Sequence, residues 1–348
     1  MIVFLLAAVI WALGWARGTP GQARLLQVGL LLVAVMALHV VLPAGHPLRE
    51  ATGGSAGVWV AMVVLVAAAW GYGRVLGRVR GMAAERQREP EPPGPFSSGE
   101  LLRYARHIAL REIGGPGQGR LRDARVLVLG AGGLGAPALL YLAGAGVGRI
   151  GVIDADDVET SNLQRQVIFR DADVGRPKAQ AAAAALRALN PHVEVRSYTR
   201  EVEPDMAEAL FRDWDLVVDG TDGAATHALA NRAAVAAGVP LVAGALSQWE
   251  GSVAVWDPSR GGPCRACVFP EDAAEGLAPN CAEAGVAGPL PGIVGAALAL
   301  EAVKVLTGAG RPLIGRILLW DGLDAEAQVV EAEAREGCAV CGGRGLRL

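Results

Sequence analysis

The stretch RVLVLGAGGLG, residues Arg125–Gly135, is the part of the sequence that decides the fold. Its four apolar residues Val126–Leu129 predict a buried strand, and glycine then permits a sharp turn into a helix expected over Leu134–Ala145. The turn carries the spacing G-x-G-x-x-G at Gly130, Gly132 and Gly135. This spacing places nucleotide phosphates at a helix N-terminus. Taken alone, it does not distinguish NAD from another phosphate-bearing ligand.

Strands and helices alternate after this stretch. Further strands are expected at Ile150–Ile153, Val193–Ser197, Leu216–Val218 and Leu241–Ala245, and helices at Lys178–Leu189, Asp205–Phe211 and Thr226–Ala237. The alternation predicts an α/β fold with a doubly wound, mostly parallel sheet, whose ligands bind beyond the carboxyl ends of the strands. Residues 292–308 are apolar as well, but Glu301 and Lys304 favour a buried helix there.

The N-terminal part of the chain has a different composition. Three apolar stretches, at Ile2–Trp15, Leu25–Leu42 and Ala56–Gly71, predict two to three transmembrane helices, the first being short for a span. A cleaved signal peptide is the alternative for the first stretch. Arginines after the third stretch place everything beyond residue 75 in the cytoplasm, so the sequence predicts a multi-pass protein of the cell inner membrane.

Three regions follow from these patterns. Residues 1–75 are expected to be a transmembrane anchor, residues 76–98 a linker rich in proline and charge, and residues 99–348 the nucleotide-binding domain. Ser97 and Glu100 match a capping box that opens a helix through about Leu110. The net charge of −3 over 348 residues gives no support to a nucleic-acid partner.

Side chains beyond the second predicted strand bear on the identity of the ligand. Asp154 lies where a carboxylate binds a ribose hydroxyl, which fits NAD and ATP equally well. Asn162, Arg165 and Lys178 follow it, and the two cations suggest a triphosphate whose leaving pyrophosphate needs neutralising. Solvated surface charges are the alternative for each cation alone.

Two further groups of residues are candidate metal ligands. In DLVVDGTDG, Asp222 is expected to serve the Mg²⁺ that accompanies ATP, an ordinary turn being the alternative. Two C-x-x-C pairs have the spacing of a closed structural zinc site, namely Cys264, Cys267, Cys338 and Cys341. Free or redox-active pairs are the alternative reading of these cysteines.

The motifs RYARHIAL, GAGGLG, DADDVETSNLQRQ, GRPK, DGTDG, PCRAC and GCAVCG occur together in this order. From about Ser97 to Gly343 the chain resembles the MoeB/ThiF/HesA family, which is related to ubiquitin-activating enzymes. The resemblance implies a homodimer with a Rossmann-like site and a C-terminal part stapled by zinc. It also implies ATP-dependent adenylation of the C-terminal glycine of a small ubiquitin-like sulfur carrier. The small subunit of molybdopterin synthase is the first expected carrier, and a thiamine-pathway carrier is the second.

The resemblance also assigns roles to residues. Gly133 is expected on the phosphates, Asp154 on the ribose, Arg165 and Lys178 on phosphates, and Asp222 on Mg²⁺ and nucleotide. Arg106 matches an arginine that such dimers insert into the neighbouring site. Cys281 lies where some relatives use a cysteine in sulfur transfer or thioester chemistry, a small loop residue with no covalent role being the alternative. Gly223 departs from the family, which usually has Asn there.

Two other classes of function remain open at this point. An NAD-dependent oxidoreductase would share the glycine turn but would leave Arg165, Lys178 and the paired cysteines unexplained. An inactive, membrane-tethered docking module would explain Gly223 but not the retained cations.

Overall fold

The computed structural model describes residues 2–43, 45–53, 55–86, 94–270 and 285–343. The chain forms two compact units, Met1–Glu91 and Pro92–Leu348, each of which is described by itself.

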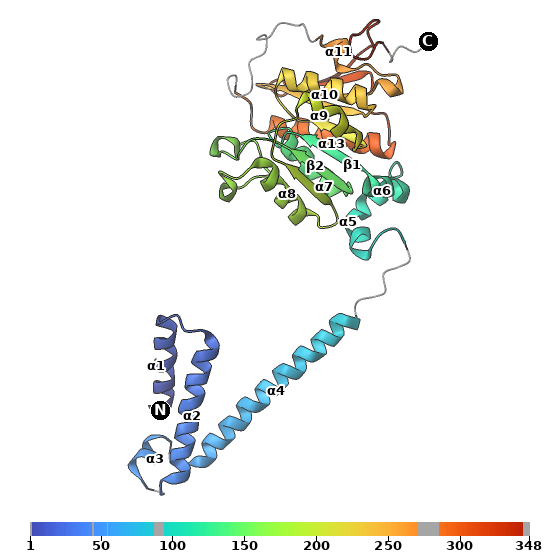
Figure 1. The fold of residues 1–348 in the computed structure, drawn as a ribbon. Coiled ribbons are helices and arrows are strands. Elements are labelled where there is room, and N and C mark those ends of the chain that lie inside the picture. The colour runs from blue at the N-terminus through green and yellow to red at the C-terminus, as the bar shows by residue number, and fades with distance from the viewer. Residues whose placement is uncertain (1, 44, 54, 87–93, 271–284, 344–348) are drawn as a thin grey trace. The chain divides into compact units, whose positions relative to one another are not determined.

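The first unit is helical (Figure 1). Its helices are α1 (Ile2–Ala16), α2 (Gly21–Val41), α3 (Pro47–Ala51) and α4 (Ala56–Arg86). Buried Val3, Val35 and Trp59 form a small interior, whereas most other apolar side chains of the unit are exposed. Segments Gly21–Val41 and Gly57–Arg80 are long and apolar enough to cross a membrane, and α1 is a shorter apolar helix. Exposed apolar helices of this length are typical of membrane spans.

The structure differs from the expected boundary at residue 75. Helix α4 continues to Arg86, so residues 76–86 are helical rather than part of an extended linker. Leu, Arg, Met, Ala and Glu dominate this stretch, and all of them are good helix formers, which explains the continuation. Residues 87–93 lie outside the described residues.

The second unit contains an eight-stranded sheet in the order β3-β2-β1-β4-β5-β6-β7-β8. Its strands are β1 (Arg125–Leu129), β2 (Arg149–Ile153), β3 (Glu194–Tyr198), β4 (Leu216–Asp219), β5 (Leu241–Ser247), β6 (Glu250–Trp256), β7 (Arg316–Asp321) and β8 (Glu326–Glu331). Strands β1 to β5 pair in parallel, which confirms the five predicted strands. Strands β6 to β8 extend the sheet in antiparallel fashion and were not predicted.

Helices cover both faces of this sheet. They are α5 (Ser98–Ile108), α6 (Gly114–Asp123), α7 (Gly135–Ala145), α8 (Lys178–Leu189), α9 (Pro204–Arg212), α10 (Ala224–Ala237), α11 (Arg265–Val268) and α13 (Leu290–Thr307). One buried core lies between the sheet and α7, α8 and α13, and a second lies between the sheet and α9 and α10. This arrangement confirms the doubly wound fold.

Two local predictions also hold. Ser97 and Glu100 form the predicted capping box, with the Glu100 carboxylate accepting the Ser97 backbone N–H at 2.9 Å. Helix α13 is buried against α7 and the sheet, with Lys304 paired to Glu301 at 2.5 Å.

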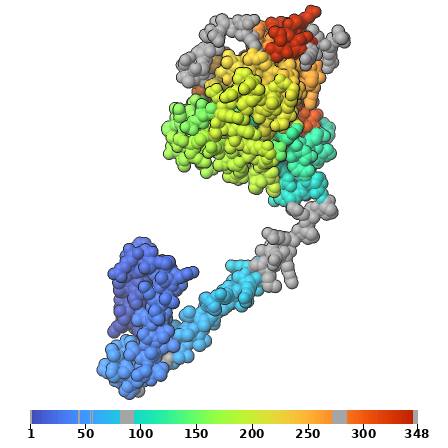
Figure 2. Space-filling view, in the orientation of Figure 1, coloured from blue at the N-terminus to red at the C-terminus, as the bar shows by residue number. Residues whose placement is uncertain are grey.

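In Figure 2 the red C-terminal segment lies against the orange part of the same unit.

Candidate nucleotide site and cysteine cluster

A cavity of about 650 Å³ opens beyond the carboxyl ends of β1, β2 and β4. Its lining includes eight of the residues predicted to bind nucleotide: Gly130, Gly132, Gly133, Asp154, Asn162, Arg165, Lys178 and Asp222. Residues separated by up to 92 positions therefore meet at one site, because the parallel strands all end at the same edge of the sheet.

The glycine turn is shaped by close backbone approaches. Gly130 has a φ of +81°, a conformation that favours glycine. A Cβ atom at Gly135 would lie 1.8 Å from the Gly130 carbonyl oxygen, so Gly135 lets helix α7 start directly behind the strand. Gly135 does not line the cavity. Its place in the motif is explained by packing, whereas Gly132 and Gly133 face the ligand space.

Asp154 closes the cavity at the end of β2. One carboxylate oxygen accepts the Ala131 N–H at 2.7 Å, and the other accepts the Asp156 N–H at 2.9 Å. Burial raises the pKa of Asp154, while these two bonds and the Lys178 charge act in the opposite direction. The carboxylate is thus held rigidly between the glycine turn and the loop after β2.

Lys178 points its ammonium group at the same loop. Its Nζ atom lies 2.6 Å from the Asp156 carboxylate, and its side chain is only 8% exposed. The Lys178 backbone N–H also donates to the Asp156 carbonyl at 2.8 Å. A cation held this deep is not a solvated surface charge. The role of Asp156 was missed, although DADD offers a carboxylate there.

Arg165 lies beside the glycine turn and is not turned away from it. A Cβ atom on Gly133 would lie 3.8 Å from Arg165 Cδ, and Arg165 Nη1 donates to the Ser161 carbonyl at 3.1 Å. Asn162 is buried, and its amide group bonds within the loop, accepting the Glu159 N–H at 3.3 Å. Asn162 therefore shapes the loop that carries Arg165.

The turn after β4 brings Asp222 to the cavity, where it remains exposed to solvent. Asp219, by contrast, is fully buried and is bonded to Thr221 and His227. Burial acts to raise the pKa of Asp219, but the His227 contact and the Thr221 bonds hold it below its usual value. Within the described residues, the acidic side chains form no preassembled metal site. One carboxylate is consistent with Mg²⁺, which takes most of its ligands from phosphates and water.

Two other residues singled out from the sequence, Arg106 and Gly223, do not line the cavity. Arg106 is exposed on α5 and does not line the cavity of its own chain. Gly223 is the N-cap of α10 and provides no capping side chain. Cys281 lies outside the described residues. Arg200, on the loop after β3, lines the cavity but was not predicted, because nothing in the sequence identifies a loop arginine as facing a site.

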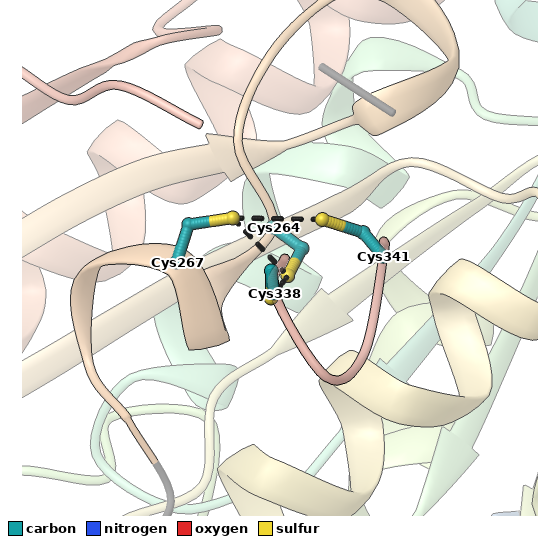
Figure 3. A group of neighbouring side chains, drawn as sticks. All are labelled: Cys264, Cys267, Cys338 and Cys341. Carbon is teal, nitrogen blue, oxygen red and sulfur yellow. Dashed lines mark hydrogen bonds between the residues drawn. The ribbon is translucent and has the colours of Figure 1, made fainter. Parts of the chain in front are cut away.

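The four paired cysteines form one buried cluster (Figure 3). Cys264 is the N-cap of the short helix α11, Cys267 lies within that helix, and Cys338 and Cys341 lie in a loop near the C-terminus. All four sulfur atoms lie within 4.8 Å of one another. Three of the distances between them, 3.8 Å, 3.7 Å and 3.5 Å, are close to the edge of about 3.8 Å expected for four thiolates bonded to one Zn²⁺.

Thiolate ligands require deprotonated sulfur. Burial raises the pKa of Cys264, the neighbouring thiols Cys341 and Cys267 act in the same direction, and a backbone hydrogen bond from Cys267 acts against them. Burial also acts on Cys338, but the backbone N–H groups of Cys341 and Val340 help to lower its pKa to about 6. The donor set and the distances fit a tetrahedral zinc ion without an open position, so the site is suited to a structural role.

Comparisons with known proteins agree with this geometry. The model of the ThiF family matches residues 104–340. The sulfur carrier protein adenylyltransferase of Thermus thermophilus is 48% identical over 247 residues, which cover 70% of this chain and 91% of that protein. The probable adenylyltransferase/sulfurtransferase MoeZ of Mycobacterium tuberculosis is 46% identical over 243 residues, which cover 69% and 62%, respectively. The crystal structure of E. coli MccB shares the fold with a TM-score of 0.62 at 22% identity, over 71% of this chain and 74% of that one.

Proposed function

Because the chain belongs to the ThiF family, we propose that it adenylates the C-terminal glycine carboxylate of a small ubiquitin-like sulfur carrier protein, using ATP and Mg²⁺. The curated relatives named above are adenylyltransferases, which makes this protein a nucleotidyltransferase and argues against hydride transfer. The observation that carries the proposal is the convergence of the glycine turn, Arg165, Lys178 and Asp222 on one cavity.

The reaction needs no nucleophile from the protein. A carboxylate oxygen of the carrier forms a bond to the α-phosphorus of ATP, and the bond between that phosphorus and the bridging oxygen of pyrophosphate breaks. The products are the acyl-adenylate and pyrophosphate. The chain's task is to hold the two substrates in line and to stabilise the charge that develops on phosphate oxygens.

Different residues of the cavity have different roles in this proposal. In it, Gly132 and Gly133 let phosphates approach the backbone N–H groups at the start of α7, and Asp154 accepts a ribose hydroxyl; all three line the cavity. Arg165 and Lys178 neutralise the pyrophosphate, for which Lys178 must exchange its Asp156 partner for a phosphate oxygen. Asp222 would hold Mg²⁺, which shields the linked phosphates when bound.

We propose that the protein is a homodimer in which Arg106 completes the neighbouring cavity. Its exposed position on α5, outside its own cavity, supports this role. Mixing Arg106→Ala with Lys178→Gln tests it. In an equal mixture of the two variants, half of the symmetric dimers contain one subunit of each, and one of the two sites in such a dimer has both Arg106 and Lys178. About a quarter of all sites are then active, although each variant alone is inactive. If the mixture is no more active than the two variants alone, the proposed role of Arg106 is wrong.

The small subunit of molybdopterin synthase is the proposed carrier, with the thiamine-pathway carrier as the alternative. The test is ATP–pyrophosphate exchange by the full chain in detergent with each carrier. A carrier lacking its terminal glycine serves as the control. Exchange with only the thiamine carrier would overturn the choice of substrate. No exchange with any carrier, in folded and zinc-loaded protein, would favour a docking module.

We further propose that two to three transmembrane helices, namely α2 and α4 with or without α1, anchor the domain to the cytoplasmic face of the inner membrane. The exposed apolar helices, and the arginines Arg74, Arg78 and Arg80 at the C-terminal end of the second candidate span, support this orientation.

Adenylation itself requires no cysteine. Cys281→Ser is therefore expected to retain pyrophosphate exchange, and loss of exchange would show that Cys281 contributes to adenylation itself.

A further inference from the structure

The buried carboxylate of Asp219 joins the end of β4 to helix α10. One of its oxygens accepts the Thr221 backbone N–H at 3.1 Å and the Thr221 hydroxyl at 2.7 Å. The other lies 2.6 Å from Nδ1 of His227. Because an ionised carboxylate can only accept, His227 Nδ1 carries the proton and donates it to this bond. Both residues are buried, so water does not compete for the bond.

The segment between these two residues is the part of the site that carries Asp222. Gly220, Thr221, Asp222 and Thr226 all line the cavity, whereas Asp219 and His227 do not. The chain thus leaves the core at a buried acid, passes the cavity and returns to the core at a buried histidine. The bond between the acid and the histidine closes this loop at its base.

The start of α10 lacks the usual means of fixing such a turn. Its N-cap, Gly223, has φ −93° and ψ 129° and makes no side-chain hydrogen bond. At this position Ser, Thr, Asp or Asn ordinarily bonds the first turn of a helix. The first helical bond here is from the His227 N–H to the Gly223 carbonyl, at 3.0 Å. His227 is therefore the first residue of α10 that is tied to the core by its side chain as well as by its backbone.

We propose that His227 is a positioning residue for the nucleotide site. The hydrogen bond from its Nδ1–H to Asp219 holds Asp222 in position at the cavity. It fixes the loop before α10, as a capping side chain would do if position 223 were not glycine. The inference rests on the proposed function only for the role of Asp222 toward ATP and Mg²⁺. The constraint on the loop is independent of that function.

The experiment compares two isosteric replacements in the full chain, purified in detergent with zinc. Asn retains an N–H group close to the position of Nδ1, whereas Gln places its N–H near that of Nε2. His227→Gln is expected to raise the KM for ATP in pyrophosphate exchange about tenfold or more, and to speed amide hydrogen exchange at residues 220–223 similarly. His227→Asn is expected to stay within about threefold of the wild type in both measurements.

A control and a rescue separate positioning from general stability. Asn231 is a buried polar residue of the same helix, and its side chain accepts the Arg265 N–H at 2.8 Å, away from the loop. Asn231→Ala is expected to lower Tm and leave the KM for ATP unchanged. Adding Gly223→Asn to His227→Gln is expected to lower the raised KM, because the backbone at 223 fits an N-cap. An added Cβ there meets only the Thr226 hydroxyl closely, at 3.2 Å.

The hydrogen-exchange measurement needs neither carrier nor nucleotide, so it tests His227 even if the protein catalyses no exchange reaction. Wild-type protection at residues 220–223 in His227→Gln would overturn the proposal. An equal rise in KM in His227→Gln and Asn231→Ala would overturn it as well. Absence of pyrophosphate exchange in the wild type, together with lost protection in His227→Gln, would refute the proposed function alone.

Discussion

We predict that the cysteine cluster binds zinc, and that removal of this zinc destabilises the second unit without abolishing its candidate nucleotide site. The cluster ties the loop around Cys264 and Cys267 to the loop around Cys338 and Cys341. A cross-link between positions about 70 residues apart removes conformational entropy from the unfolded chain. By the loop-entropy relation used for disulfides, this raises the free energy of the unfolded state by about 4 kcal/mol. Loss of that link is expected to lower Tm by about 8–16 °C for a domain of this size.

The assay is thermal unfolding of the full chain in detergent, with and without a zinc chelator, together with the zinc content measured by mass spectrometry. Cys341→Ser should bind less zinc and unfold at the lower temperature even when zinc is supplied. Cys281→Ser is the matched control, since four cysteines already complete the cluster, and its zinc content and Tm should equal those of the wild type. None of the four cluster cysteines lines the cavity, so ATP binding should persist in Cys341→Ser at low temperature.

Two results would refute this reasoning. Purified protein that contains no zinc after growth in zinc-replete medium would remove its premise. An unchanged Tm after complete removal of the metal would show that packing around the cysteines, rather than the metal, holds the two loops together.

Four further variants test the geometry of the site. Gly135→Ala should lower the free energy of unfolding by about 3 kcal/mol or more, because its Cβ cannot fit 1.8 Å from the Gly130 carbonyl. Gly132→Ala should fold normally yet bind ATP more weakly, because its Cβ would meet only Gln166, at 3.8 Å. Equal chemical-denaturation curves for Gly135→Ala and Gly132→Ala would contradict the expected difference in stability between them. Lys178→Gln should reduce kcat/KM for pyrophosphate exchange about 10²–10³-fold, and retained activity would rule out a phosphate contact. The wild type should have a higher free energy of unfolding than Asp219→Asn, and this difference should be fully present above the ordinary Asp pKa of about 3.9. The difference should shrink as the pH falls through the lowered pKa of Asp219 in the folded protein. Denaturation at a series of pH values measures it.

In the parallel half of the sheet, β1, β2 and β4 were predictable as short apolar runs that end in or precede glycine or aspartate, and β3 and β5 from the alternation of strands and helices. The antiparallel half was not. The turn between β5 and β6 contains Gln248, which has a positive φ of 43°, and Trp249, rather than the Asn-Gly or Asp-Gly pair that marks a tight hairpin. Asp321-Gly322 between β7 and β8 offered a turn signal, but β8 alternates too weakly to mark a strand by itself.

The candidate site was predictable where the residue type alone restricts the chemistry. Glycines in a turn, a carboxylate at a strand end and isolated cations in a loop each suggest a ligand, and the fold brings them together. Partners of these residues were not predictable. The Lys178–Asp156 and Asp219–His227 contacts depend on side-chain directions in three dimensions, and sequence spacing does not specify those directions.

The pairing of Glu301 with Lys304 inside α13 bears on how the ribosome-bound chain is sorted during synthesis. By length and hydropathy this segment matches α2 and α4, so an insertion machinery that reads hydropathy would meet a third candidate for lateral release into lipid. A lysine at the bilayer centre costs about 2.5–3.5 kcal/mol on the insertion scale. By the time the segment emerges, β1 to β6 have already been translated and offer its apolar side chains a protein surface. The two charged residues therefore favour burial of this segment in the second unit over release into lipid.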